Sequence, residues 1–216
     1  MQKTQATIEW WAANGSILFE SLGILAFALS GLIEAARKKL DLVGMTMVAA
    51  LAAFGGGTVR DVLLDRRPFY WVQNLVWIYI IIGLCAVSLV FVRTRHLDLT
   101  ERAMQWPDAI GLGIFTASGT QIALEAHMPP VVAVIMGTIT AIFGGVARDI
   151  VVNEIPKAFI DHEPYAVIAF TGGWIVVIGD ALGWQSFASL WVCALAIIAL
   201  RLATMIFGWR VPAWRV

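Results

Sequence analysis

Long apolar runs alternate with short polar breaks along almost the whole chain. A helix needs about 20 mostly apolar residues to cross a bilayer, and seven runs approach this length. The expected membrane-spanning helices cover residues 15–34, 42–64, 75–94, 108–127, 131–153, 164–183 and 185–207. Charges, prolines or glycine-rich turns mark the breaks between them. Because the break at 180–183 is short, one long hairpin there, and six helices in total, is the alternative.

The composition indicates the same class of protein. Of the 216 residues, 60% are hydrophobic and 14% are charged, whereas soluble domains carry roughly 25% charged residues. The formal net charge of zero gives no sign of a nucleic-acid partner. We therefore expect an all-α integral membrane protein whose single transmembrane domain, residues 1–216, contacts membrane lipid.

The placement of Lys and Arg predicts the orientation, because cytoplasmic loops carry an excess of these residues. One side of the predicted topology holds nine of them: Arg37, Lys38, Lys39, Arg93, Arg95, Arg102, Lys157, Arg210 and Arg215. The other side holds Lys3, Arg66 and Arg67, with Arg60 added if it reaches that surface. We expect a multi-pass protein of the plasma (inner) membrane, with its N-terminus outside and its C-terminus in the cytoplasm.

An internal repeat emerges when the chain is compared with itself at an offset of 88 residues. Residues 20–71 and 108–159 then share 12 identities in 52 positions without a gap. A shared apolar composition does not explain why the identities concentrate on Gly, Arg, Asp and Pro. We expect a first repeat at about 15–94, a second at about 108–183, and an extra C-terminal helix at about 185–207.

Each repeat holds three predicted helices, so the second copy must enter the membrane from the opposite side. The two repeats are therefore expected to be inverted about a pseudo-two-fold axis in the membrane plane, with the seventh helix outside the symmetry. Inverted repeats of this kind place permeation or substrate sites between the halves, at helices interrupted by glycine.

Glycines interrupt the second helix of each repeat, at Gly55-Gly56-Gly57-Thr58 and at Gly144-Gly145. Glycine destabilises a helix by roughly 1 kcal/mol per residue relative to Ala, and irregular backbone at membrane depth needs protein or water beside it. The functional interpretation is a kinked pore lining with exposed carbonyls. The alternative is close helix packing, because small residues let two backbones approach. Two symmetric copies, each followed by charges, favour the permeation path.

Charged pairs follow both glycine runs, as Arg60-Asp61 and Arg148-Asp149. Four charges inside a membrane need partners or water. Neighbouring residues on a helix do not face one another. We therefore hypothesise pairs across the pseudo-axis, Arg60 with Asp149 and Arg148 with Asp61. Functional and purely structural roles are both open for these four residues.

Other polar residues extend the set of candidate pore residues. Glu20 and Asp108 occupy equivalent positions early in the first helix of each repeat. An acid near a helix N-terminus complements the helix dipole, which favours a capping role for Asp108 after Pro107, whereas Glu20 lies deeper. Ser30 and Ser118 could also face a cavity, although hydroxyls in helices often bond only to backbone.

No arrangement of residues indicates an enzyme, a metal site or a cofactor. Cys85 and Cys193 lie in apolar runs, as small buried hydrophobes do, and the three histidines are far apart in the sequence. The run Gly55-Gly56-Gly57 lacks the Gly-Lys-Ser/Thr that a phosphate-binding loop requires. We expect no catalytic residues, no metal and no cofactor.

The sequence resembles the prokaryotic branch of the trimeric intracellular cation (TRIC) channel family over about residues 15–207. The resemblance rests on residues 55–64 with Pro68 and on residues 144–149 with Pro156. It implies seven helices, a homotrimer, and one potassium-permeable pore inside each protomer. It also implies that the second and fifth helices are kinked at these glycines, which line the pore.

Two positions depart from the family pattern: Glu20 stands where Asp is expected, and Phe143 stands where a third Gly of the second run is expected. The two kinks therefore need not be equivalent. Some bacterial members of the wider family are also thought to move glycine instead of potassium.

Three functions remain open. A passive channel for potassium or sodium ions is favoured, because glycine breaks offer carbonyls that replace hydration and no energy-coupling domain is present. A secondary transporter of a small neutral amino acid such as glycine is the alternative, because broken inverted repeats are typical of transporters and paired Arg and Asp could hold its two charges. A non-transporting scaffold leaves the two glycine breaks unexplained.

Overall fold

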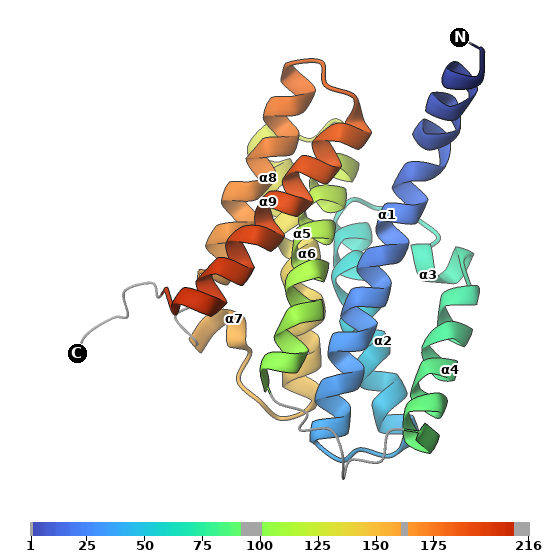
Figure 1. Ribbon diagram of the computed structural model, residues 1–216, viewed down its shortest axis with the longest axis vertical. Coiled ribbons are helices and arrows are strands. Elements are labelled where there is room, and N and C mark those ends of the chain that lie inside the picture. The colour runs from blue at the N-terminus through green and yellow to red at the C-terminus, as the bar shows by residue number, and fades with distance from the viewer. Residues whose placement is uncertain (1, 92–100, 161–163, 210–216) are drawn as a thin grey trace.

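The computed structural model describes residues 2–91, 101–160 and 164–209, and these residues form nine helices and no strands. The helices are α1 (Gln2–Arg37), α2 (Leu42–Leu63), α3 (Tyr70–Gln73), α4 (Val76–Phe91), α5 (Glu101–Glu125), α6 (Pro130–Val151), α7 (Lys157–Ile160), α8 (Tyr165–Ala181) and α9 (Ser186–Phe207). The seven long helices form one bundle (Figure 1). Each overlaps one of the seven predicted ranges, and α8 and α9 are separate helices joined by a turn.

Local sequence explains where several helices begin and end. The Asp41 carboxylate caps α2 by accepting a hydrogen bond from the Gly44 backbone N–H at 2.8 Å. Pro130 opens α6, where the N–H that proline lacks would have no partner in the helix. At the end of α9, Gly208 has a φ of 64°, the left-handed conformation that glycine adopts readily.

Helix α5 differs from its predicted range at its start. It begins at Glu101, so Pro107 lies inside the helix. Asp108 therefore follows almost two turns of helix and does not stand at the N-terminus. The predicted capping role for Asp108 is wrong for this reason.

Four helices of the described chain are long and apolar enough to cross a membrane: Leu18–Arg37 of α1, α2, α6 and α9. The apolar segments Val76–Leu89 and Tyr165–Ala181 are shorter, and α5 carries four charged residues within Glu101–Glu125. The chain is thus a helical membrane protein. That all seven long helices span the bilayer stays a prediction.

Large hydrophobic side chains such as Val43, Tyr79 and Phe207 are exposed on the outer surface of the bundle. Such a surface suits contact with lipid. The orientation of the termini stays a prediction, and four of the basic residues behind it lie outside the described residues: Arg93, Arg95, Arg210 and Arg215.

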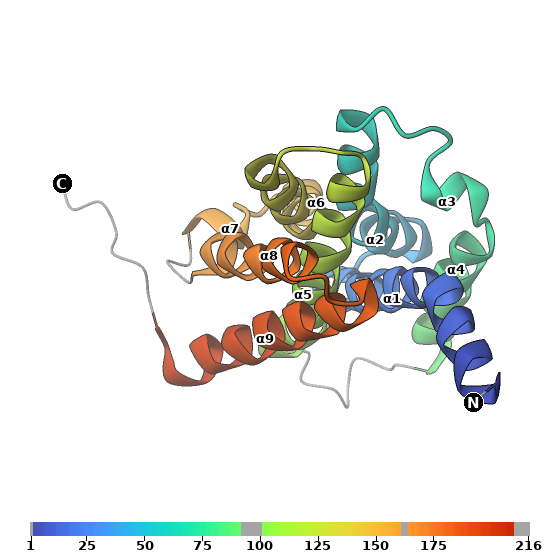
Figure 2. The same ribbon diagram turned by 90° about the horizontal axis from the view of Figure 1, so that it is seen from above.

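Helix α5 lies at the centre of the bundle and packs against α1, α6, α8 and α9 (Figure 2). The pair α1 and α2 has its counterpart in α5 and α6, and α2 packs against α6. The third helices of the two repeats differ: α4 packs chiefly against α2, whereas α8 packs against α5, α6 and α9. The unrepeated helix α9 therefore covers the second repeat more than the first.

Backbone and packing geometry recur at the offset of 88 residues. In the described chain, four residues other than glycine have a positive φ, between 52° and 59°: Lys39, Asp65, His127 and Asn153. They form two pairs at this offset, and each follows a helix end by two residues, where a left-handed residue terminates many helices. The rings of Phe27 and Phe115, which are also equivalent, contact each other with centroids 5.2 Å apart.

Candidate functional site

Helices α2 and α6 touch where their glycines meet. A β-carbon on Gly56 would overlap the Thr140 carbonyl oxygen, and one on Gly144 would overlap the Ala52 carbonyl oxygen. These two contacts are equivalent at the offset of 88. Both helices continue through the glycines, so close packing explains Gly56 and Gly144. The predicted kinks are not confirmed.

The neighbouring glycines have more space. A β-carbon on Gly55 would lie 3.4 Å from the backbone of α6. One on Gly57 would lie 3.8 Å from a guanidinium nitrogen of Arg60, and one on Gly145 would lie 3.6 Å from a guanidinium nitrogen of Arg148. The glycine runs therefore bring α2 and α6 together on one side and border the buried arginines on the other.

The first cluster surrounds Arg60, whose side chain is 1% exposed near the end of α2. Its Nε donates to Oδ1 of Asp61 at 2.9 Å, and its Nη1 donates to Oε1 of Glu20 on α1 at 3.1 Å. The Arg66 guanidinium also lies 3.7 Å from Oδ1 of Asp61. These carboxylates compensate the Arg60 charge, which would otherwise be costly to bury.

The second cluster surrounds Arg148 at the equivalent position of α6. Its Nε donates to Oδ1 of Asp149 at 2.8 Å, and its Nη1 donates to Oδ1 of Asp108 at 2.8 Å and to the Ser30 hydroxyl. The Tyr165 hydroxyl of α8 donates to Oδ2 of Asp108 at 2.6 Å. Both oxygens of Asp108 are therefore engaged by protein groups.

The ion pairs differ from the predicted ones. Arg60 does not pair with Asp149, nor Arg148 with Asp61; each arginine bonds the next residue and the acid on the first helix of its own repeat. The reason is the reach of the arginine side chain. Its Nε can turn back to the adjacent carboxylate while Nη1 extends to another helix, because the guanidinium presents five N–H donors in a fork.

The first cluster lines a cavity. The cavity has a volume of about 300 Å³ and is lined by three acids and three arginines: Glu20, Asp61, Asp65, Arg60, Arg66 and Arg67. The Glu20 side chain is 14% exposed, whereas the equivalent Asp108 is 8% exposed. In the second cluster, the Lys157 backbone N–H also bonds Oδ2 of Asp149 at 3.1 Å. One cluster is thus open and the other is closed.

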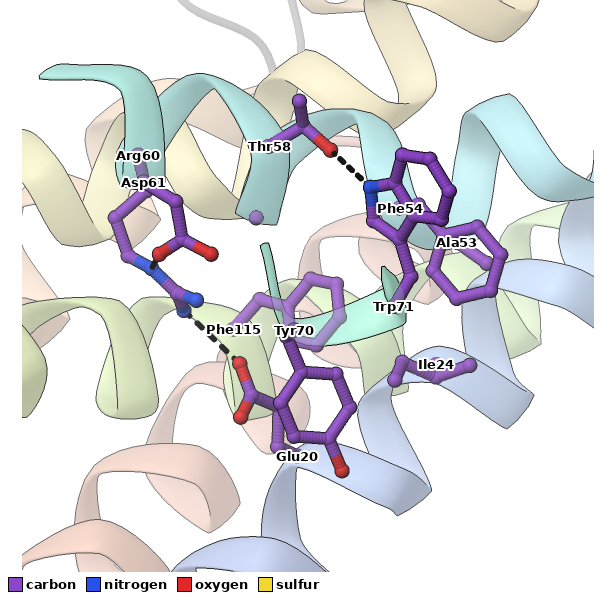
Figure 3. A pocket seen from close by; sticks show the side chains of 11 residues that line it. Glu20, Ile24, Ala53, Phe54, Thr58, Arg60, Asp61, Tyr70, Trp71 and Phe115 are labelled. Atoms are coloured by element: carbon purple, nitrogen blue, oxygen red, sulfur yellow. Dashed lines mark hydrogen bonds and ion pairs between the residues drawn. The ribbon is translucent and has the colours of Figure 1, made fainter. Parts of the chain in front are cut away.

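A smaller cavity of about 20 Å³ adjoins the larger one (Figure 3). It shares four lining residues with it: Glu20, Arg60, Asp61 and Tyr70. Four aromatic rings contribute to its walls: Phe54, Tyr70, Trp71 and Phe115. The Trp71 indole N–H donates to the Thr58 hydroxyl at 3.1 Å, and its ring centroid lies 6.2 Å from that of Phe54. We call this cavity the aromatic pocket.

The structure brings most of the predicted polar site residues into these two clusters. Ser30 joins the second cluster although it belongs to the first repeat. Its equivalent Ser118 joins neither, and its buried hydroxyl has no hydrogen-bond partner among the described residues. Thr58 lines the aromatic pocket, where its hydroxyl accepts a hydrogen bond from the Trp71 indole and belongs to neither ion-pair cluster.

The sequence reasoning missed several residues of the site. Trp71 and Tyr165 were not among the predicted site residues, and Tyr165 carried no signal in the sequence. Arg201 of α9 was also missed; it is buried, and its guanidinium carbon lies 5.1 Å from the centroid of the Tyr165 ring. The signal for Arg201 was available, because a charged residue inside an apolar helix is by itself a sign of function.

Comparison with known families bears on what these clusters do. The sequence model of the family described as "Glycine transporter" matches residues 17–95 and 105–181, close to the two predicted repeats. The chain belongs to this family. A UPF0126 membrane protein of Vibrio cholerae is 32% identical over 197 residues, which cover 91% of this chain and 82% of the relative. The UPF0126 inner membrane protein YadS of Escherichia coli K12 is 34% identical over 152 residues, 70% of this chain and 72% of YadS.

Solved structures show the same fold. The structure described as the TRIC trimeric intracellular cation channel orthologue from Rhodobacter sphaeroides superposes with a TM-score of 0.84 at 31% identity. The match covers 91% of this chain and 100% of the orthologue. The predicted resemblance to the prokaryotic TRIC family is confirmed.

Proposed function

We propose that the protein is a potassium-permeable channel for monovalent cations, with a permeation path inside each protomer. The charge of the two clusters carries this proposal. They contain four carboxylates and two guanidinium groups: Glu20, Asp61, Asp108, Asp149, Arg60 and Arg148. When all six groups are ionised, their net charge is −2. The lining of the 300 Å³ cavity itself is balanced at three acids and three arginines, so the surplus of negative charge lies in the buried clusters. Negative charge in a low-dielectric wall attracts cations and repels anions.

The proposed path runs between α1, α2, α5 and α6, and the 300 Å³ cavity at Arg60 is its entrance. In this proposal, the contact between the α2 and α6 backbones at Gly56 and Gly144 closes the path beyond the entrance. The path opens when α2 and α6 move relative to each other at this contact. The proposal includes seven spanning helices in two inverted repeats, with the N-terminus outside.

The trimer is part of the same proposal. The Rhodobacter sphaeroides orthologue is described as a trimeric cation channel, and the fold similarity extends over nearly the whole of both chains. We therefore propose a homotrimer in the inner membrane with one path in each protomer.

Single-channel recording and potassium flux from potassium-loaded liposomes test the channel. We expect discrete, cation-selective currents, and a smaller conductance in Glu20→Gln and Asp61→Asn, which remove negative charge at the entrance. Asp180→Asn is the matched control, because Asp180 is exposed on α8 and lines neither cavity. Folded protein without unitary current would overturn the proposal. Bulky residues at Gly56 or Gly144 are unsuitable here, because they disrupt helix packing whether or not a pore exists.

A second candidate is a transporter of glycine, and two observations favour it. The matching family is described as a glycine transporter, and the 300 Å³ cavity presents both guanidinium and carboxylate groups to one solute. Radiolabelled glycine uptake into the same liposomes separates the candidates. Saturable uptake without unitary current would establish the transporter in place of the channel.

A further inference from the structure

The aromatic pocket is lined chiefly by residues of the first repeat, with Phe115 of α5 from the second. Three of its aromatic residues, Phe54, Tyr70 and Trp71, correspond at the offset of 88 to Ile142, Ala158 and Phe159. The first two of these equivalents are not aromatic, and the third is not enclosed by protein. Phe159 is 68% exposed. In the second cluster, the Tyr165 hydroxyl instead donates a hydrogen bond to Asp108, the acid that is equivalent to Glu20. Helix packing does not require that one repeat carry aromatic residues where the other does not. The aromatic residues of the pocket therefore need another explanation.

Aromatic rings and a carboxylate line this pocket. Figure 3 shows the Glu20 carboxylate beside the Tyr70 ring, with Arg60 on one side and the Phe54 and Trp71 rings on the other. Arg60 engages one carboxylate oxygen, Oε1. Since a carboxylate accepts hydrogen bonds at both oxygens, Oε2 of Glu20 can serve a ligand in the pocket.

We propose that the aromatic pocket binds an ammonium group, held against the ring faces by cation–π attraction and hydrogen-bonded to Glu20. Aromatic side chains bind organic cations in this way. An alkali ion suits the pocket less well, because it would exchange its hydration shell for apolar ring faces. An ammonium group retains N–H donors for Glu20, and its carbon substituent extends into the adjoining 300 Å³ cavity.

The size of the pocket restricts the ligand. A volume of about 20 Å³ accommodates one group of the size of a water molecule. The ammonium ion or the head of a primary amine is of this size. A quaternary ammonium ion with four methyl groups is too large for it.

The adjacent Arg60 does not prevent binding. Its guanidinium bonds both Asp61 and Glu20, so these three groups carry a net charge of −1 when ionised. One ammonium group brings that charge to zero. Arg66, the next cation, has a side chain that is 49% exposed and is therefore screened by water and salt.

Two sources supply the same chemistry: a simple amine, or the ammonium group of a small amino acid. The amino acid would place its carboxylate in the adjoining 300 Å³ cavity beside Arg66 and Arg67. Neither source requires that the protein conduct potassium, although the pocket shares Glu20, Arg60 and Asp61 with the proposed entrance.

Calorimetric titration of the purified full-length protein with methylammonium chloride tests the site, against potassium chloride at equal ionic strength. We expect saturable binding that weakens about tenfold in Phe54→Ile and in Trp71→Leu, each of which removes one ring face. Phe54→Ile copies the residue that the fold already accepts at Ile142. Phe159→Leu is the matched control and leaves binding unchanged. Tetramethylammonium gives no saturable binding.

Binding that is equal in the wild type, Phe54→Ile and Trp71→Leu would overturn the proposal, as would equal binding of tetramethylammonium. If Trp71→Leu does not fold, Glu20→Gln, which keeps the side-chain size, replaces it and is expected to weaken binding. If glycine displaces methylammonium at a concentration below that at which methylammonium itself half-saturates the site, the source is an amino acid. If glycine does not compete, the source is a simple amine. Potassium currents recorded from the same variants keep this result separate from the channel proposal.

Discussion

The clusters around Arg60 and Arg148 occupy equivalent positions of the two repeats and have the same ion-pair pattern, yet their surroundings differ. In the second repeat, Tyr165 and Ser30 close the cluster around Asp108. In the first, Glu20 lines a cavity of about 300 Å³. The third helices account for this difference, since α8 packs against α5, α6 and α9 while α4 packs chiefly against α2.

The comparison shows that a duplicated motif can preserve its charges while its surroundings diverge. The arginine, the following aspartate and the acid on the first helix are retained in both copies. What changes is whether a neighbouring helix seals the acid. We infer that the closed cluster holds α5 and α6 together and that the open cluster is the one that meets solutes.

The largest expected effect is the loss of Asp108. Asp108→Ala removes one of the two carboxylates that compensate the buried Arg148 and the acceptor of the Tyr165 hydroxyl, and we expect a loss of about 3–5 kcal/mol in the free energy of unfolding. Glu20→Ala should cost only about 1 kcal/mol, because water in the cavity can replace the carboxylate. Chemical unfolding in mixed micelles measures both. Equal losses would remove the distinction between a closed and an open cluster.

The helix contact should respond equally in both repeats. Gly56→Ala and Gly144→Ala each force a β-carbon into a carbonyl oxygen of the other helix, and we expect each to cost about 1–3 kcal/mol. Gly57→Ala and Gly145→Ala are the matched controls, because their β-carbons would lie at ordinary contact distances. The same unfolding assay applies. A large difference between Gly56→Ala and Gly144→Ala would show that the contact is not symmetric.

Thiol labelling compares the water access of the two clusters at equivalent positions. Thr58 lines the aromatic pocket, whereas its equivalent Val146 is 8% exposed. We expect a polar thiol reagent to modify Thr58→Cys severalfold faster than Val146→Cys. The native Cys85 and Cys193 are both buried, so the background is low. Equal rates would mean that both clusters are reached by water to the same extent.

The smallest expected effect concerns a surface contact between the repeats. Lys38 hydrogen-bonds Glu154 and lowers the pKa of its carboxyl below 4.5. A lowered pKa stabilises the fold above the unfolded value, and this stabilisation is lost as the pH falls through the folded value. The melting temperature of the wild type should therefore fall slightly more below pH 4.5 than that of Glu154→Gln. Identical pH profiles would show that this pair contributes nothing.

Hydropathy predicted the helices well because apolar length alone marks a helix in a membrane protein. The range 42–64 became α2 at Leu42–Leu63, and 185–207 became α9 at Ser186–Phe207. The start of α5 was missed because Pro107 lies inside the helix and does not mark its boundary. The internal repeat located both arginine clusters, because charges inside apolar helices stand out in the sequence.

The partners of those charges could not be predicted in the same way. Spacing along a helix does not describe how far an arginine side chain reaches, so the adjacent pairs Arg60-Asp61 and Arg148-Asp149 were wrongly excluded. A kinked helix and a close contact between two helices both require glycine, so the sequence does not distinguish them. Only the position of α6 against α2 shows that Gly56 and Gly144 serve a helix contact. The aromatic pocket depends on where the short helix α3 packs, which no local pattern indicates.

The reciprocal contact between Gly56 and Thr140 and between Gly144 and Ala52 has a mechanical consequence: it is a fulcrum. Arg60 and Arg148 each lie four residues beyond the glycine, about 6 Å along the helix at 1.5 Å per residue. A rotation of about 10° at the fulcrum moves each guanidinium by about 1 Å over this lever arm. That displacement takes the Arg60–Glu20 hydrogen bond, now 3.1 Å, beyond the usual limit of about 3.2 Å. Because the lever arms are equal, we expect the cluster that is less enclosed by protein, around Arg60, to lose its hydrogen bond first.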